Sequence, residues 1–304
     1  MADASDLALA LAGTRVLSLA LNIPGPVAAS RLRDLGARVT KVESPRGDPL
    51  ARAAPAWFAA LHRSIERVSL DLKVSSDRAE LDARLADTDV LLTSSRPSAL
   101  ARLGLAWDAL HARHPRIVHV AIVGEMAPYD ERPGHDLTYV ARAGLLEPPA
   151  MPRVLVADFG GAERAVTAVL ALLLRRTSSG AGARAEIALR DAAEAFAAPL
   201  RYGLTAKTGA LGGAFPTYAL YRARDAWIAV AALEPHFAAT LAREIGADLA
   251  REFAAEDAAT WERFGIIHDI PIARVATRAA TPTDLEERPI CQTTRKTAAR
   301  KAKV

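Results

Sequence analysis

Short apolar runs of β-forming residues alternate with helical segments along the first 125 residues. Residues 14–21 and 37–42 are β-rich, and between them Pro24-Gly25-Pro26 leads into residues 27–35, whose apolar spacing is helical. A strand, a helix and a second strand in this order are typical of a parallel sheet covered by helices. The alternation continues, with strands predicted at residues 67–72, 90–93 and 117–123 and helices at 77–86 and 107–113.

A helix predicted at residues 158–176 and a strand at 183–189 complete the first part of the chain. From residue 191 the pattern differs and predicts a smaller α+β domain, with helices at residues 191–205, 236–245, 247–253 and 258–263 and a hairpin of 218–221 with 226–232. We therefore predict an α/β fold with a large parallel-sheet domain, helices on both faces of its sheet, and a smaller α+β domain. The predicted limits are residues 1–190 for the large domain, 191–280 for the small domain and 281–304 for a flexible basic tail.

The composition is that of a globular chain, with 51% hydrophobic and 24% charged residues among 304. No apolar run is long enough to span a bilayer, and the first residues lack the basic start of a secretory signal. Cys291 is the single cysteine, so an internal disulfide is excluded, and its Pro- and Thr-rich surroundings do not resemble those of a catalytic thiol. These features predict a cytoplasmic location and no membrane partner.

The net charge of +4 is unevenly distributed, because the last ten residues carry five lysines and arginines and no acid. Such a run is typical of a solvated tail. The chain has few aromatic residues and no recognisable nucleic-acid module, so we expect no nucleic-acid partner. A basic chain also suits a polyanionic small ligand.

Three short segments carry acid and base groups in an alanine- and leucine-rich background: residues 134–139 with His135, residues 156–161 with Asp158, and residues 232–235 with Glu234. An imidazole and carboxylates can move a proton on and off a carbon if the fold brings them together. Each residue also has a structural interpretation. His135 could be an ordinary loop histidine, Asp158 a helix N-cap at the end of the strand-like run 154–157, and Glu234 a surface carboxylate.

These segments also carry a resemblance to a known family. Residues 134–139 resemble the GHDxxY segment of α-methylacyl-CoA racemases, residues 158–161 the DFxG segment, and residues 232–237 the IEPxF segment. Earlier segments at residues 29–37, 41–49, 68–73 and 96–105 are similar to the LxDLGA, KVExPxGDP, VxLDLK and RPG…RLGL segments. In this order, over about residues 12–240, they resemble the family III CoA-transferase superfamily (CaiB/BaiF type), and within it the α-methylacyl-CoA racemases most closely.

The resemblance implies a racemase of 2-methylacyl-CoA thioesters in fatty acid metabolism, with an interlocked homodimer as its assembly. It implies that His135 serves one face of the substrate carbon with Glu234 orienting its ring, and that Asp158, supported by Asp136, serves the other. The implied reaction needs no metal or other cofactor, because CoA is part of the substrate. The implied substrate- and CoA-binding residues are Arg46, Arg63, Arg96, Arg102, Gly134, Leu137, Thr138 and Tyr139.

Two other functions remain open. The first is a family III CoA transferase, in which Asp158 would be the nucleophile and would form an aspartyl-CoA thioester. The second is a weakly active or non-catalytic CoA-binding paralogue. It is suggested by two departures from the family pattern: residues 62–65 lack the expected lysine, and residues 124–128 replace a glycine-rich loop.

Overall fold

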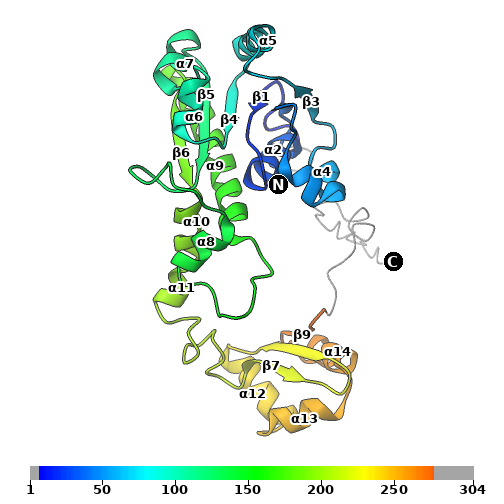
Figure 1. The fold of residues 1–304 in the computed structure, drawn as a ribbon. Coiled ribbons are helices and arrows are strands. Elements are labelled where there is room, and N and C mark those ends of the chain that lie inside the picture. The colour runs from blue at the N-terminus through cyan, green and yellow to red at the C-terminus, as the bar shows by residue number, and fades with distance from the viewer. Residues whose placement is uncertain (1–6, 277–304) are drawn as a thin grey trace, which may run out of the picture. The chain divides into compact units, whose positions relative to one another are not determined.

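The computed structural model describes residues 7–276, which fall into two units (Figure 1). The first unit extends to Phe196 and the second begins at Ala197. Cys291 and the predicted basic tail lie outside the described residues. No helix within the described residues is both long enough and apolar enough to cross a membrane.

The first unit is built on a six-stranded parallel sheet, which confirms the predicted fold class. Its strands are β1 (Arg15–Ser18), β2 (Arg38–Glu43), β3 (Glu66–Ser69), β4 (Val90–Thr93), β5 (Val118–Val123) and β6 (Arg184–Ala188). They lie in the order β3-β2-β1-β4-β5-β6, and every neighbouring pair is parallel. All residues of β4 and β5 are buried, which explains why these strands are mostly apolar rather than alternating, with Thr93 and His119 as their buried polar residues.

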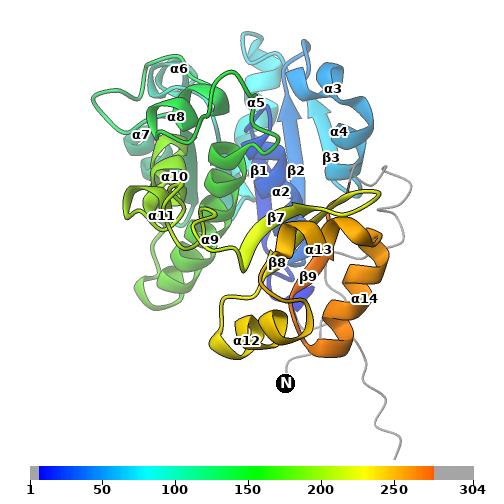
Figure 2. The same ribbon diagram turned by 90° about the horizontal axis from the view of Figure 1, so that it is seen from below.

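Helices cover both faces of this sheet (Figure 2). They are α2 (Pro24–Asp34), α3 (Pro49–Ala53), α4 (Pro55–Leu61), α5 (Ser75–Ala86), α6 (Pro97–Arg102), α7 (Trp107–Arg113), α8 (Asp136–Arg142), α9 (Val156–Ser179) and α10 (Leu189–Phe196). Buried residues of α2 and α9 pack on one face of the sheet, and those of α5, α6 and α7 pack on the other. Four of these helices have proline at their first position, where the missing N–H costs nothing.

The second unit contains a three-stranded antiparallel sheet in the order β7-β8-β9. Its elements are α11 (Ala198–Arg201), β7 (Tyr218–Arg222), β8 (Trp227–Ala231), α12 (Pro235–Glu244), α13 (Leu249–Ala255), α14 (Ala258–His268) and β9 (Ile272–Arg274). β7 and β8 form the predicted hairpin. Ile228, Leu241 and Phe253 are fully buried and centre a separate core, so this unit has a hydrophobic core of its own.

Two predicted elements are wrong. Residues 154–157 are not a strand, because α9 already begins at Val156 and places Asp158 in its first turn. The helix predicted at 191–205 is interrupted after Phe196, and the short α11 follows it. Pro199 accounts for the interruption. In a continuous helix its ring would clash with the carbonyl group four residues earlier, and it has no N–H to donate to that carbonyl.

Candidate active site

A cavity of about 300 Å³ opens at the carboxyl ends of β1, β4 and β5. All of its lining residues belong to the first unit. They are Leu21, Asn22, Pro24, Ser94, Ser95, Arg96, Ile122, Val123, Gly124, Asp130, Arg132, Pro133, Gly134, His135, Tyr139, Asp158 and Leu189. In the sheet, β2 lies on one side of β1 and β4 lies on the other side. The cavity therefore lies where the strand order reverses. Open α/β sheets bind their ligands at such a position.

His135 reaches the cavity from the amino-terminal end of α8. Its backbone is extended, with φ −140° and ψ 169°, and it is the N-cap residue of the helix. The His135 N–H donates to Thr138 Oγ1 over 3.1 Å, and this hydroxyl donates back to the His135 carbonyl over 2.8 Å. Thr138 thus fixes the backbone that carries the imidazole. The ring itself is exposed and lines the cavity.

Asp158 enters the same cavity from the first turn of α9 and is only 7% exposed. Its backbone N–H donates to Asp136 Oδ1 over 2.9 Å. Burial, and to a smaller extent the nearby charge of Asp136, together raise the pKa of Asp158 to about 7. Asp158 can therefore both give and take a proton near neutral pH.

Asp136 lies between the two candidate proton carriers. It follows His135 directly in the chain, and its side chain caps the helix that carries Asp158. It is 4% exposed, and its second oxygen, Oδ2, is buried with no hydrogen-bond partner among residues 7–276. A buried carboxylate oxygen without a donor is uncommon and is typical of functional sites.

Glycines explain why Tyr139 can reach the cavity. A Cβ on Gly124 would lie 2.2 Å from the Tyr139 hydroxyl, and a Cβ on Gly134 would lie 2.4 Å from it. The phenol therefore fits only because both neighbours lack a side chain. Burial raises the pKa of Tyr139, and the charges of Glu125 and Asp158 add to this effect, so the hydroxyl stays protonated near neutral pH.

The two glycines that follow Phe159 serve packing between helices. A Cβ on Gly160 would lie 2.5 Å from Phe196 Cε2, and one on Gly161 would lie 2.3 Å from Leu189 Cδ2. Both contacts are with α10, so these glycines let α9 and α10 approach closely. The glycines of the Asp158 segment therefore hold the helix that presents the carboxylate.

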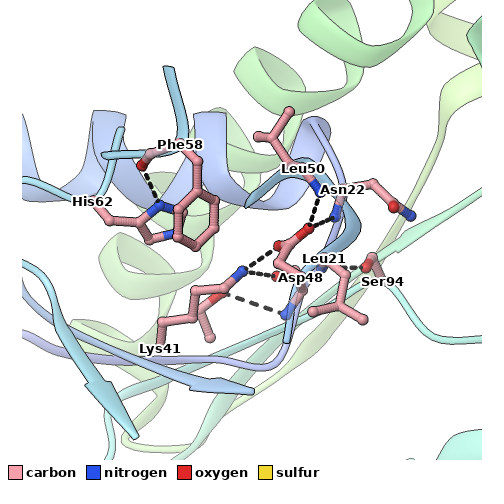
Figure 3. A network of polar contacts seen from close by, with 10 residues as sticks. Leu21, Asn22, Lys41, Asp48, Leu50, Phe58, His62 and Ser94 are labelled. Atoms are coloured by element: carbon pink, nitrogen blue, oxygen red, sulfur yellow. Dashed lines mark hydrogen bonds and ion pairs between the residues drawn. The ribbon is translucent and has the colours of Figure 1, made fainter. Parts of the chain in front are cut away.

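A buried ion pair that the sequence interpretation missed supports the cavity rim (Figure 3). Lys41 Nζ on β2 lies 2.7 Å from Asp48 Oδ2 and 2.9 Å from the Ala20 carbonyl oxygen. Asp48 Oδ1 accepts the N–H of Asn22 over 3.1 Å and that of Leu50 over 3.0 Å. Lys41 and Asp48 both lie in the segment 41–49 that resembles KVExPxGDP, but the sequence did not show that the two side chains meet.

The loop after β1 is also tied to the neighbouring strand. The Leu21 N–H donates to Ser94 Oγ over 2.8 Å, just after β4 (Figure 3). Asp48 and Ser94 thus hold two successive backbone N–H groups of this loop. Leu21, Asn22 and Ser94 all line the cavity, so these bonds set the shape of its rim.

A second charged cluster holds α8 against the sheet. Glu125, which follows β5, is buried and forms ion pairs with Arg142 of α8 and, over 2.8 Å, with Arg190 of α10. The Arg190 N–H also donates to the Gly124 carbonyl over 3.0 Å. The residue that replaces part of the expected glycine-rich loop therefore has a structural role beside the cavity.

The remaining predicted site residues are placed as follows. Arg96 lines the cavity with Gly134 and Tyr139, whereas Arg46, Arg63, Arg102 and Leu137 are exposed and do not belong to its lining. Glu234 is the exposed N-cap residue of α12 in the second unit. That Glu234 orients His135, and that the arginines bind CoA, stay predictions. Within residues 7–276 no cluster of three or more His, Cys, Asp or Glu side chains could hold a metal ion.

Comparison with known proteins gives the same family for most of the chain. The family model described as CoA-transferase family III matches residues 11–283. A Mycobacterium tuberculosis protein named "Probable fatty acyl-CoA transferase" is 33% identical over 208 residues, which cover 62% of this chain and 52% of that protein. The "Alpha-methylacyl-CoA racemase" of Mus musculus is 30% identical over 256 residues, covering 78% of this chain and 65% of that protein.

A third relative, the "Succinate--glutarate CoA-transferase" of Agrobacterium fabrum, is 29% identical over 214 residues, covering 63% of this chain and 54% of that protein. The chain spans about half the length of the first curated relatives it matches. Among solved structures, that of a hypothetical protein from Mycobacterium tuberculosis has a TM-score of 0.77 at 25% identity, covering 91% of this chain and 86% of the other. That of a CaiB/BaiF family protein from Brucella suis has a TM-score of 0.74 at 23% identity, covering 92% and 86%.

Proposed function

The chain belongs to CoA-transferase family III, and we propose that it racemises 2-methylacyl-CoA thioesters by moving the α-proton between two bases. The observation that carries this proposal is that His135 and Asp158 line one cavity, with the pKa of Asp158 near 7. A proton carrier is most effective when its pKa is close to the working pH. The relative named as a racemase, which matches 78% of this chain, supports the same reaction.

In the proposed reaction one base breaks the α-C–H bond. The electron pair of that bond moves into a carbon–carbon double bond, and the thioester oxygen takes the negative charge of an enolate. The acid on the opposite side then returns a proton to the other face of the carbon. His135 and Asp158 exchange the roles of base and acid when the reaction runs in the reverse direction. Atoms and charge balance within the substrate and the two side chains, so the proposed reaction uses no metal or redox cofactor.

Neighbouring residues support these two roles. Asp136 raises the pKa of Asp158, in addition to the larger effect of burial, and so favours the acid form that can donate a proton. Arg96 is the predicted CoA-binding arginine that lines the cavity, where a guanidinium suits an anionic or polar group of the substrate. Glu234 of the second unit as the partner of His135, and an interlocked homodimer as the assembly, belong to the same proposal.

A CoA transferase is the second candidate, because several of the relatives carry transferase names. In that reaction an oxygen of ionised Asp158 attacks the donor thioester carbonyl and releases CoA thiolate, leaving an acyl-aspartyl anhydride. CoA thiolate then attacks the aspartyl carbonyl and releases the acid, which leaves an aspartyl-CoA thioester for the acceptor. The absence of a hydrogen bond to the Asp158 carboxyl group within residues 7–276 leaves its oxygens available for this role.

Incubation with 2-methylbutanoyl-CoA in deuterated water tests the first proposal. Wild-type protein should place deuterium on the α-carbon, and Asp158→Asn should lower that rate by about 10²–10⁴-fold. Asp191→Asn on α10 is the matched control, because Asp191 is exposed and does not line the cavity, and it should keep the wild-type rate.

Other outcomes point to the other functions. A hydroxylamine-trappable acyl group on Asp158, without α-exchange, would establish the transferase. Binding of CoA without exchange or trapping would establish the non-catalytic paralogue. Either result would contradict the racemase proposal.

A further inference from the structure

Asn22 has a left-handed backbone conformation, which few residues other than glycine adopt. Its φ is 64°, in the left-handed region, where a side chain on the Cβ is disfavoured and glycine is not. Only two other non-glycine residues within residues 7–276, Ser64 and Asp269, have a positive φ. Neither of those two lines the cavity. Non-glycine residues in this backbone region cluster at functional sites.

The surroundings hold Asn22 firmly in this conformation. Its N–H donates to Asp48 Oδ1, and the preceding N–H of Leu21 donates to Ser94 Oγ. Asp48 is itself fixed by the buried Lys41, whose side chain also bonds the Ala20 carbonyl. The loop is thus held from both neighbouring strands, and a glycine at position 22 would fit it with less strain.

The side chain of Asn22 takes no part in that framework. Figure 3 shows it directed away from the Asp48 carboxylate, and Asn22 lines the cavity together with His135 and Asp158. No hydrogen bond to its carboxamide is found within residues 7–276. A carboxamide offers two N–H donors, so this group can bind an oxygen of a ligand in the cavity.

We propose that the Asn22 carboxamide donates a hydrogen bond to the thioester oxygen of the substrate and stabilises the enolate that forms there. This inference rests on the proposed function and adds a substrate-contacting residue to it. An asparagine at position 22 then has a reason, because it tolerates the left-handed backbone better than most side chains and, unlike glycine, it carries a donor. A fixed donor aimed at developing charge contributes strongly to catalysis.

Substitution by glycine separates this role from a structural one. Asn22→Gly keeps the left-handed conformation and removes only the carboxamide, so its melting temperature should stay within about 4 °C of wild type. Its kcat for α-deuterium exchange should fall about 10²–10³-fold, and its KM should rise by no more than about 5- to 10-fold, the effect of one hydrogen bond in the ground state. Asn22→Asp keeps the shape and replaces the donors with acceptors, and should lose kcat to a similar extent. Asp269→Gly, at the C-cap of α14 and outside the residues that line the cavity, is the matched control and should keep the wild-type kcat.

Binding of a carbonyl-free analogue sharpens the test. Wild type should bind 2-methylbutanoyl-CoA about 5- to 10-fold more tightly than Asn22→Gly, the effect of about one hydrogen bond. With the S-(2-methylbutyl)-CoA thioether, which has no carbonyl oxygen, the two proteins should bind equally. Calorimetry measures both affinities without any need for turnover.

The outcomes separate the inference from the function on which it rests. Wild-type exchange with an unchanged kcat in Asn22→Gly would overturn the inference and leave the racemase intact. Absence of α-deuterium exchange by the wild-type protein would overturn the racemase proposal. The affinities for the thioester and the thioether would then still test whether Asn22 contacts the carbonyl oxygen. Equal affinities of both proteins for the thioester would overturn that contact.

Discussion

Asp48 and Asp158 are two buried aspartates of the same unit with opposite surroundings. Asp48 is 1% exposed, and its oxygens are satisfied by Lys41, by the Asn22 N–H and by the Leu50 N–H. Asp158 is 7% exposed and has a second carboxylate, Asp136, as its charged neighbour. Burial alone therefore does not decide whether a carboxylate is structural or reactive. The partner decides, because a cation offsets the cost of desolvation and a second anion adds to it.

The largest expected effect comes from breaking the compensated pair. Lys41→Met leaves the Asp48 charge buried without its cation, which should lower the free energy of unfolding by about 3–5 kcal/mol. Urea denaturation followed by circular dichroism measures this change. Lys73→Met, at an exposed lysine, is the control and should change the free energy by less than about 0.5 kcal/mol. A loss below about 1 kcal/mol in Lys41→Met would be close to that of an ordinary surface substitution. It would mean that water or a rearranged side chain stabilises the Asp48 carboxylate in place of Lys41.

A smaller effect is expected beside the uncompensated carboxylate. Gly124→Ala places a methyl group against the Tyr139 hydroxyl and should lower the free energy of unfolding by about 1–3 kcal/mol. In a Tyr139→Phe background the hydroxyl is gone, so the same substitution should cost clearly less. A double-mutant cycle of denaturation midpoints measures the coupling. Equal costs in both backgrounds would show that the clash is relieved elsewhere.

The smallest expected effect is a shift in pH dependence. Asp136→Asn keeps an acceptor for the Asp158 N–H but removes the like charge, so the pKa of Asp158 should fall from about 7 while staying above 3.8, because burial is the larger cause. The limb of the exchange-rate profile that reports Asp158 should move to lower pH. Carbon-13 NMR of the Asp158 carboxyl measures the pKa directly. An unchanged value in Asp136→Asn would show that Asp136 does not contribute, and Asp191→Asn controls for a general loss of negative charge.

Stability should follow the same pKa. The folded protein holds the Asp158 proton more tightly than the unfolded chain, whose pKa is near 3.8. The contribution of Asp158 to stability therefore falls as the pH rises from about 4 to about 7, and it is fully unfavourable above that range. In Asp136→Asn this decline should be smaller.

Local sequence patterns predicted much of the fold. The bounds of β4 and α7 are those expected from residues 90–93 and 107–113, because a buried strand and an amphipathic helix have distinct apolar spacing. The apolar run 154–157 was misassigned because four residues fit a strand or a helix start equally well. The hydrogen bond from the Phe159 N–H to the Leu155 carbonyl shows that α9 has already begun there.

The candidate site was predictable in its residue types but not in its supports. His135 and Asp158 carry recognisable segments, and both line the cavity. The burial of Lys41 could not be predicted, since a lysine is normally expected at the surface and its pairing with Asp48 is seen only in the fold. Asn22 was not predicted as a site residue, because its loop is held by hydrogen bonds to Asp48 and Ser94 from distant parts of the chain.

The cap that Asp136 places on α9 has a mechanical consequence. Because Asp136 follows His135 directly and accepts the Asp158 N–H, the two candidate proton carriers are connected through a single residue. A displacement of α8 would therefore move the first turn of α9 with it, and the separation between imidazole and carboxyl would change less than the position of either helix.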